Sequence, residues 1–368
     1  MRIFVDGHFL GGKKQGVAVY IERLYAVYAK LRGDCKIIFG VNRGTQVDVE
    51  ILSNSNVLVV QYPIGGKLRY LFDIPYLCDK HKIDIIHTQY VLPIVIGKKT
   101  LRHVTIHDVL FEDYPQLFSG VYRCLRHYLF YHSAVNADIL TTVSIYSLES
   151  IERHYGPKNV KCELIPPGAT IKAYICQEPE ILVPEFNRYI IYVSRFEKRK
   201  NHHRLVLVFE RLKKRFPDLG LVLVGFDVDG SMGALKTQIE ALDLNESVKF
   251  MAGISDDIMF RLIKEAAAVV YPSLCEGFGI PILEALFVNP KTLFSATSAM
   301  AEFTFASSNM FDPMDLESME EKIAEYLSKC FNNSEDWFIQ KEKIIERYNW
   351  NLSAAKLGEL YNRTRAEK

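Results

Sequence analysis

Two series of short apolar runs, each interleaved with helical patterns, constrain the fold of this chain more than any other feature. Strands that alternate with amphipathic helices favour a parallel sheet with helices on its faces. The first series predicts strands over Ile3–Val5, Lys36–Val41, Val57–Gln61, Ile83–His87, Val104–His107 and Ile139–Val143. The second series predicts strands over Tyr189–Val193, Leu219–Gly225, Val248–Met251, Ala268–Tyr271 and Thr292–Phe294. The helices expected between them include Val17–Leu31 and His203–Arg215. The pattern therefore predicts an α/β protein with two doubly wound halves.

The length of the chain supports two domains. It has 368 residues, and single cores stop growing beyond roughly 250–300 residues. A polar stretch through Pro179 and Pro184 separates the two series, so we expect domains over residues 1–170 and 180–349. Ligands gather at the carboxyl ends of parallel strands. Two such halves, facing each other across a cleft, would share one site.

Composition excludes several classes of protein. The net charge is +1 and no basic block with interleaved aromatic residues is present, so we do not expect a nucleic-acid partner. The seven cysteines show no metal-ligand or redox spacing, which suits a reducing cytosol. The first residues lack the features of a signal peptide, and no apolar run approaches the roughly 20 residues that span a bilayer. We expect a cytoplasmic protein whose membrane contact, if any, is peripheral.

The most informative segment is EGFGIPILE, from Glu276 to Glu284, which follows a predicted buried strand. Gly277 and Gly279 allow a tight turn close to a ligand, and Pro281 suits the first turn of a helix. The amino end of that helix favours a phosphate or diphosphate. Carboxylates accept hydrogen bonds, so Glu284 suits a vicinal diol such as ribose and Glu276 suits a sugar hydroxyl.

An alternative makes Glu276 an exposed loop residue and Glu284 a partner of the helix dipole. The spacing of the two glutamates does not decide between these interpretations. The whole string favours the ligand-binding interpretation, because the flanking glycines and the proline fit one ligand geometry.

On these residues the chain resembles glycosyltransferase family 4, whose members carry an EGFGxPxxEA string. The resemblance implies the GT-B fold, with two Rossmann-like domains facing across a cleft and a final helix over residues 350–368 packing back on the first domain. It implies that Glu284 holds the donor ribose, that Glu276 contacts the transferred sugar, and that the first domain binds the acceptor. It also implies that the loop residues near the diphosphate and sugar are Gly277, Phe278, Gly279 and Ile280.

A second motif follows the first strand of the second half. Arg195 and Lys200 are basic groups that can neutralise a departing diphosphate, a need of any transfer from a nucleotide sugar. The spacing of Arg195, Lys200 and Asn201 resembles the family's R-x-x-x-K-N pattern. The alternative is a solvated basic loop, which is a common surface feature.

The first half offers a glycine-rich loop, Gly11–Gly16, between a strand and a helix, and we expect Gly16 to meet the donor phosphates. The loop is neither a P-loop nor a dinucleotide fingerprint, and a plain flexible loop is the alternative. His107 is the leading candidate of this half, because it should lie at the carboxyl end of its strand and donate to a sugar hydroxyl or a backbone carbonyl. A packed structural histidine is the alternative there, and His87 is a weaker second candidate.

Three further segments are less specific. Ile254 lies in a loop resembling the family's loop beside the nucleotide base, where backbone groups make the contact. Ser144 is expected to cap a helix, its commonest use. Asp227 and Asp229 could hold a divalent cation, but a polar turn explains them without a ligand, so we expect no metal site.

The stretch Val121–His132, VYRCLRHYLFYH, is basic and aromatic. It admits two explanations, a helix resting on a membrane that bears a lipid-linked acceptor, or aromatic packing in the core.

The resemblance implies a retaining, metal-independent glycosyltransferase that needs no cofactor beyond its donor substrate. The donor would be GDP-mannose or a UDP- or dTDP-hexose, and the acceptor a glycan or lipid-linked saccharide of bacterial surface polysaccharide, reached at the inner face of the plasma membrane. Two alternatives stay open. A nucleotide-sugar epimerase of GT-B fold would consume donor without acceptor, and a regulator that binds a nucleotide sugar would form no product.

Overall fold

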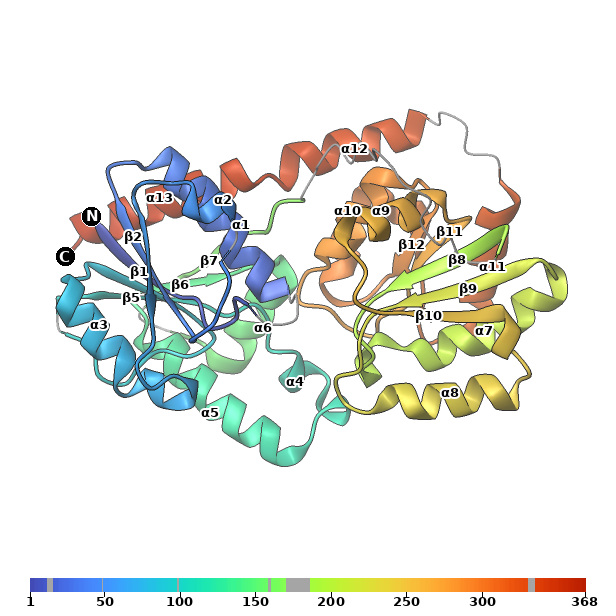
Figure 1. Cartoon of the computed structure of the whole chain (residues 1–368), viewed down its shortest axis with the longest axis horizontal. Coiled ribbons are helices and arrows are strands. Elements are labelled where there is room, and N and C mark those ends of the chain that lie inside the picture. The colour runs from blue at the N-terminus through green and yellow to red at the C-terminus, as the bar shows by residue number, and fades with distance from the viewer. Residues whose placement is uncertain (12–15, 48, 98, 158–159, 170–185, 330–334) are drawn as a thin grey trace. The chain divides into compact units, whose positions relative to one another are not determined.

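The computed structural model describes residues 1–11, 16–47, 49–97, 99–157, 160–169, 186–329 and 335–368. The chain divides into two compact units, Met1–Gly168 with Tyr348–Lys368, and Ala169–Arg347 (Figure 1). We call them unit 1 and unit 2 and describe each by itself. The expected linker residues Pro179 and Pro184, and residues 12–15 of the glycine-rich loop, lie outside the described residues.

Unit 1 is built on a seven-stranded sheet in the order β3-β2-β1-β4-β5-β6-β7, in which every neighbouring pair is parallel. Its strands are β1 (Arg2–Asp6), β2 (Lys36–Val41), β3 (Val57–Gln61), β4 (Ile85–Gln89), β5 (Leu101–Thr105), β6 (Ile139–Thr142) and β7 (Cys162–Leu164). The order reverses between β1 and β4, so the carboxyl ends of these two strands flank the topological switch point of the sheet.

Helices cover both faces of this sheet (Figure 1). They are α1 (Gly16–Leu31), α2 (Val49–Leu52), α3 (Asp73–His81), α4 (Leu110–Asp113), α5 (Gly120–Asn136), α6 (Ile145–Tyr155) and α13 (Trp350–Ala366), with 3-10 turns η1 (Gly66–Tyr70) and η2 (Pro115–Leu117). Helix α3 packs on the face presented by Phe4, Ile38 and Ile86. Helices α1 and α13 lie side by side and cover the opposite face. A strand's side chains alternate between faces, so His87 points away from α3.

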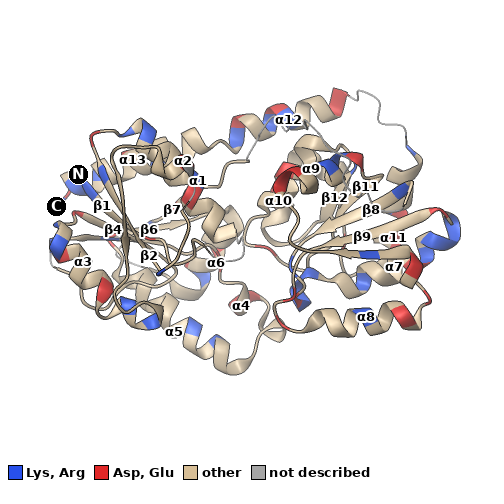
Figure 2. Ribbon diagram, viewed as in Figure 1, with Lys and Arg blue, Asp and Glu red and all other residues tan. Residues whose placement is uncertain are grey.

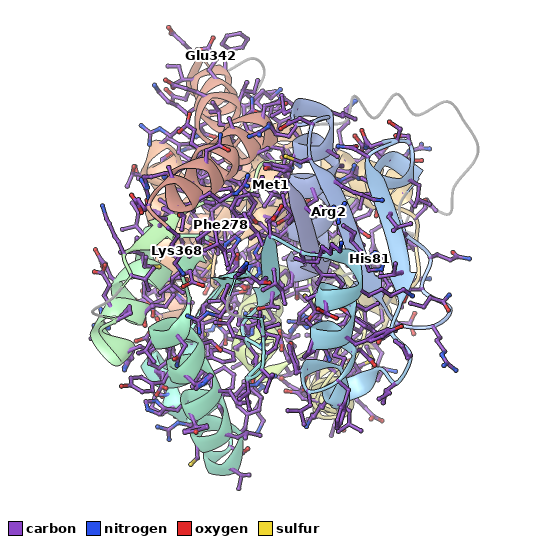
Figure 3. The ribbon with its side chains drawn as sticks, turned by 90° about the vertical axis from the view of Figure 1, so that its left-hand side faces the viewer. Met1, Arg2, His81, Phe278, Glu342 and Lys368 are labelled. Carbon is purple, nitrogen blue, oxygen red and sulfur yellow. The ribbon has the colours of Figure 1, made fainter. Side chains whose placement is uncertain are left out.

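The start of β1 is tied to the end of α3. The Arg2 guanidinium donates from Nη1 to the backbone carbonyl of His81 at 3.1 Å, and both residues are labelled in Figure 3. The Arg2 backbone N–H also donates to Asp84, at 2.7 Å, just before β4. These bonds fix the amino ends of the two strands that flank the switch point.

Unit 2 is built on a six-stranded parallel sheet in the order β10-β9-β8-β11-β12-β13. Its strands are β8 (Arg188–Val193), β9 (Leu219–Val224), β10 (Val248–Met251), β11 (Ala268–Tyr271), β12 (Thr292–Ser295) and β13 (Met310–Phe311). Its helices are α7 (His202–Arg215), α8 (Ser231–Ala241), α9 (Asp256–Glu265), α10 (Ile280–Val288), α11 (Leu316–Ser328) and α12 (Glu335–Arg347). Its 3-10 turns are η3 (Lys198–Lys200), η4 (Asn245–Ser247), η5 (Ser298–Glu302) and η6 (Thr304–Asn309). The two doubly wound α/β sheets expected from the sequence are thus present.

One predicted strand end is wrong in a way that matters for the site. The strand expected to close at His87 runs on to Gln89, because Thr88 and Gln89 continue the pairing with β5. His87 is therefore fully buried inside the sheet and does not reach its carboxyl edge. The strand expected to end at His107 ends at Thr105, and His107 follows two residues later.

Helix α5 contains features of both explanations offered for Val121–His132. Val121 is 82% exposed, Leu125 54% and Tyr128 67%, while Phe130 is the buried aromatic of the helix. Arg123 and Arg126 are only partly exposed and flank the buried side of the helix, and α5 has no Asp or Glu (Figure 2). None of the helices built from described residues has the length and apolar character that crossing a bilayer requires.

Candidate functional site

In unit 2 the strand order reverses between β8 and β11, and the two strongest sequence motifs follow these two strands. Arg195 and Lys200 come after β8, and Glu276 comes after β11. The carboxyl ends of two such strands form the crevice in which doubly wound sheets bind ligands. Topology alone therefore places the two motifs at one candidate site.

Lys200 and Glu276 are bonded to each other across this crevice. Lys200 Nζ lies 2.5 Å from Glu276 Oε1, and Arg199 Nη1 lies 2.8 Å from Glu276 Oε2. The three side chains are only 13–15% exposed. Arg199 also donates to the carbonyl of Cys275, at 3.0 Å. Both oxygens of Glu276 are thus held by cations from the other motif.

The ion pairs continue to Arg195. Arg199 Nη2 lies 2.7 Å from Glu197 Oε1, and Arg195 Nη2 lies 3.1 Å from the same oxygen. Arg195 is the most exposed of the group, at 30%. Three cations thus face two carboxylates, and the cluster keeps an excess of positive charge that suits a diphosphate.

The charges of this cluster stabilise the ionised form of Glu276. Burial alone would raise its pKa, but the attractions of Lys200 and Arg199 outweigh burial and hold that pKa well below its usual range. Glu276 is therefore an acceptor at every physiological pH.

Asn201 explains how Lys200 reaches Glu276. Its backbone is in the left-handed region, with φ of 62°, which ends the turn η3 and starts α7. Its buried amide Nδ2 donates to the carbonyls of Pro272 and Pro313, each at 3.0 Å. Asparagine tolerates this backbone conformation and supplies two donors. The residue therefore fastens the loop after β8 to the end of β11.

The loop after β11 ends at the amino terminus of α10. Gly279 precedes the helix with φ of 113°, a conformation that other residues avoid, and it brings no side chain to cap the first turn. Ile280 and Pro281 are the first two helical residues. Phe278 is buried against Phe303, with ring centroids 5.7 Å apart, so its side chain anchors the loop.

Glu284 lies in the second turn of α10 and is partly buried. Its charge contributes to raising the pKa of Tyr271, at the end of β11, after the larger effect of burial. Gly277 lies between Glu276 and Phe278 in the same loop. All the residues expected from the glutamate string thus belong to one loop and one helix end.

Two other candidates of unit 2 lie in turns that follow strands. Ile254 follows β10 and precedes Ser255, whose hydroxyl accepts the backbone N–H of Ile258 and caps α9. Asp229 accepts backbone N–H groups of Ser231 and Lys198, as a turn residue does. Within the described ranges, no group of three or more His, Cys, Asp or Glu side chains is arranged to hold a metal ion.

His107 and Gly16 belong to unit 1. Gly16 is the first residue of α1, and the loop before it lies outside the described residues. His107 is 7% exposed, lies against the Tyr20 ring at 5.0 Å, and has its Nε2 2.7 Å from Gln89 Oε1. Burial lowers the pKa of His107 to about 3, so its imidazole is neutral. Ser144 caps α6 through the backbone N–H of Ser147, as expected.

Behind His107 lies a closed ring of six buried hydrogen bonds, with distances of 2.7–2.9 Å. Its members, in order, are His87, Tyr25, Tyr361, His103, Thr141 and Thr105. The two imidazoles stack with centroids 3.7 Å apart, and burial lowers the pKa of both. Each neutral imidazole and each hydroxyl donates once and accepts once, so the ring satisfies all six groups.

Gln89 connects this ring to His107. Its amide Nε2 lies 3.2 Å from His87 Nε2, and an amide nitrogen only donates, so in this amide orientation Gln89 shares the lone pair of His87 Nε2 with the closer Thr105 hydroxyl. Gln89 Oε1 then accepts the Nε2 proton of His107. With this amide orientation, the remaining nitrogen of His107, Nδ1, is an acceptor.

The sequence did not single out Arg199 or Gln89. Arg199 stands between two basic residues of the same loop, and the pattern does not tell which of these side chains turns toward Glu276. Gln89 carries a weak signal, because a polar residue at the end of a buried parallel strand lies at the ligand edge of the sheet.

The two parallel-sheet units together have the GT-B fold of glycosyltransferases. The structure of sucrose-phosphate synthase from Thermosynechococcus elongatus superposes with a TM-score of 0.80 at 18% identity, covering 100% of this chain and 99% of that one. HepE of Anabaena, in complex with UDP and glucose, gives a TM-score of 0.73 at 18% identity, covering 98% and 99%.

Family models match both halves of the chain. Residues 177–343 match the model described as glycosyl transferases group 1, and residues 14–172 match the model described as glycosyltransferase family 4. The chain is 25% identical over 237 residues to the O-antigen chain mannosyltransferase RfbU of Salmonella typhimurium, which is 64% of this chain and 62% of that relative. The aligned region spans less than two thirds of that relative, and the two family models show that both halves of the chain are similar to glycosyltransferases.

Proposed function

We propose that this protein is a retaining, metal-independent glycosyltransferase that moves a hexose from a nucleotide-diphosphate sugar to a glycan or lipid-linked acceptor of a bacterial surface polysaccharide. The single observation that carries the proposal is the bond between Lys200 and Glu276 at the switch point of unit 2. The Lys200 cation can bind a diphosphate, the Glu276 carboxylate can accept hydrogen bonds from a sugar, and the two groups are adjacent.

In this proposal the donor replaces the internal ion pairs. The diphosphate takes the cations Arg195, Arg199 and Lys200 and lies at the amino end of α10, where the helix dipole favours negative charge. Glu276, released from Lys200, accepts hydrogen bonds from the sugar hydroxyls, and Glu284 accepts from the ribose diol.

The transfer step then breaks the bond between the anomeric carbon and the phosphate oxygen. The acceptor oxygen forms a bond to the same carbon on the face that the phosphate leaves, which retains the anomeric configuration. The acceptor proton passes to the departing phosphate oxygen. Arg195, Lys200 and the helix amides stabilise the charge that develops on the diphosphate, a contribution that needs no metal ion.

Replacement of Lys200 tests this assignment. Lys200→Ala should reduce turnover at saturating donor by about 10²–10³-fold, the usual effect of removing one group that stabilises transition-state charge. Lys198→Ala is the matched control, because Lys198 is an exposed lysine of the same turn. Full turnover by Lys200→Ala would end the assignment. Donor incubated without acceptor distinguishes transfer from epimerisation, which would give a new nucleotide sugar.

The exposed face of α5 supports contact with a membrane that carries the acceptor. Val121, Leu125 and Tyr128 are large apolar side chains in water, and the helix carries Arg123 and Arg126 but no acidic residue. Exposed apolar side chains on a helix of positive charge favour adsorption to anionic lipid. The proposal therefore places the protein at the cytoplasmic face of the plasma membrane.

A further inference from the structure

Unit 1 has a second switch point, between β1 and β4, and a cluster of polar and aromatic side chains lies there. Asp6 is the last residue of β1, His8 and Phe9 follow it, and Tyr90 follows β4. Tyr90 has φ of 65°, a left-handed backbone that is costly for a bulky residue, and strained residues of this kind cluster at functional sites. None of the expectations from the sequence involved these residues.

Asp6 is the centre of this cluster. It is completely buried, and its carboxylate accepts from the Tyr62 hydroxyl at 2.7 Å, from the Arg69 guanidinium at 3.3 Å and from His8 Nδ1 at 3.0 Å. Burial alone would raise the pKa of Asp6, but His8 and Arg69 outweigh burial and hold that pKa well below its usual range. Asp6 is therefore a buried carboxylate that only accepts.

This carboxylate fixes the tautomer of His8. Because Asp6 cannot donate, the proton of the neutral imidazole lies on Nδ1 and the lone pair lies on Nε2. The His8 side chain is 19% exposed, whereas Asp6 is fully buried and the Arg69 side chain is 6% exposed. His8 is thus the member of this charged group that reaches the surface, and Nε2 is its acceptor.

Aromatic rings surround the imidazole. The Phe9 ring lies 3.8 Å from the His8 ring, and the Tyr70 ring meets it edge-on at 6.5 Å. Tyr90 lies 6.5 Å from Phe9 and 5.3 Å from His107. Apolar rings with a few fixed polar groups are the usual lining of small-molecule sites, and they suit a sugar, which has apolar C–H faces and hydroxyls at its rim.

The charges at the centre of the cluster are already paired. Arg69 neutralises Asp6, and the other donors of Arg69 bond the carbonyl of Gly66 at 2.6 Å and the hydroxyl of Tyr70 at 2.8 Å. The arginine thus already has its partners, and in the neutral imidazole His8 Nε2 offers a ligand a lone pair and no charge. The preferred ligand is a neutral molecule with a hydroxyl to donate.

We propose that His8, with Phe9, Tyr70 and Tyr90, forms a binding site for a neutral saccharide, in which a sugar hydroxyl donates to His8 Nε2. Identifying this saccharide as the acceptor rests on the proposed function. Asp6 is a positioning residue, because it acts on the sugar through the tautomer of His8.

Binding can be tested without turnover. In protein labelled with 15N-histidine, methyl hexopyranosides should shift the Nε2 resonance of His8, and inorganic phosphate should leave it unchanged. The spectrum of His8→Asn identifies the resonance. An unchanged resonance with every hexopyranoside, or a shift with phosphate alone, would overturn the proposal.

Two substitutions separate this role from a structural one. In His8→Asn the amide nitrogen replaces Nδ1 and keeps the bond to Asp6 but deletes the acceptor at Nε2, whereas His8→Gln restores a polar group near Nε2. His8→Asn should keep donor affinity and thermal stability and raise the acceptor KM about tenfold, the effect of one lost hydrogen bond. His8→Gln should recover part of the lost acceptor affinity. A lower melting temperature with an unchanged acceptor KM would show that the cluster is structural only.

These readouts distinguish the failure of the two proposals. Hexopyranosides that shift His8 in a protein without transferase activity would leave the site standing and end the proposed function. Transferase activity in a protein whose His8 resonance does not shift with any saccharide would end the His8 site and leave the proposed function standing.

Discussion

Lys200 Nζ lies 2.5 Å from Glu276 Oε1, so the cation proposed for the diphosphate is bonded to the carboxylate proposed for the transferred sugar. In the proposed mechanism, Lys200 and Glu276 stay bonded to each other until the donor binds. A diphosphate that binds Lys200 also frees Glu276, and this exchange couples recognition of the two ends of the donor. The coupling costs some affinity, because the internal bond has to be given up.

Glu276→Gln should therefore separate binding from transfer. The amide no longer holds Lys200 and Arg199 by charge, so a nucleoside diphosphate should bind about tenfold more tightly, since a charge-assisted hydrogen bond contributes about 1.5–3 kcal/mol. Transfer should fall by about 10²-fold, because the sugar loses its charged acceptor. Isothermal titration with GDP, UDP and dTDP, beside steady-state transfer, measures both effects. Weaker binding of all three nucleotides would contradict the exchange.

Three buried histidines of unit 1 should make the free energy of unfolding depend on pH at values above those at which carboxylates titrate. Burial lowers the pKa of His103 and His107 to about 3, and that of His87 is also lowered. The unfolded histidines take up protons below about pH 6.5, which the folded ones do not, so the unfolding free energy falls as pH drops through that value. Each histidine accounts for up to about 1.4 kcal/mol per pH unit.

Thermal melts between pH 7 and pH 5 check this dependence. Carboxylates with lowered pKa, such as Glu276, lose their contribution only below about pH 4.5, so they leave this window to the histidines. A melting temperature that is the same at pH 7 and pH 5 would show that the imidazoles are not buried as described.

The sequence predicted the sheets well because buried parallel strands are continuous apolar runs. Lys36–Val41 and Val57–Gln61 have the bounds that were expected. It missed β7 and β13, which have three and two residues and lie at the sheet edges. Runs that short carry no periodicity, and their pairing decides whether they are strands.

Some residues of the candidate sites could be predicted from the sequence and others could not. The glutamate string was found because its residues lie within nine positions of the chain and follow a strand. The hydrogen-bond ring was not, because His103 and Tyr361 are 258 residues apart and each looks like an ordinary core residue. Local chemistry can be read from a sequence, whereas polar networks depend on which faces meet in the fold.

The ring should make the Tyr361 hydroxyl important for stability. Tyr361→Phe leaves Tyr25 without an acceptor and His103 Nδ1 without a donor, which should destabilise the protein by about 1–3 kcal/mol in chemical denaturation. Tyr28→Phe is the matched control, because the Tyr28 hydroxyl is buried without a hydrogen-bond partner among the described residues. Equal stability of the two variants would mean that the ring contributes nothing.

The exposed face of α5 should bind anionic vesicles. Leu125 is 54% exposed on α5, and Leu352 is 55% exposed on α13, so Leu125→Glu and Leu352→Glu change equally accessible leucines. Burying a leucine side chain stabilises by about 1.5–3 kcal/mol, so Leu125→Glu should weaken binding at least about tenfold, and Leu352→Glu should leave it unchanged. Cosedimentation with phosphatidylglycerol vesicles measures this difference, and phosphatidylcholine vesicles should bind less of every variant because the positive charge of α5 then meets no anionic lipid. Equal binding of the two variants would place the membrane contact, or its absence, away from α5.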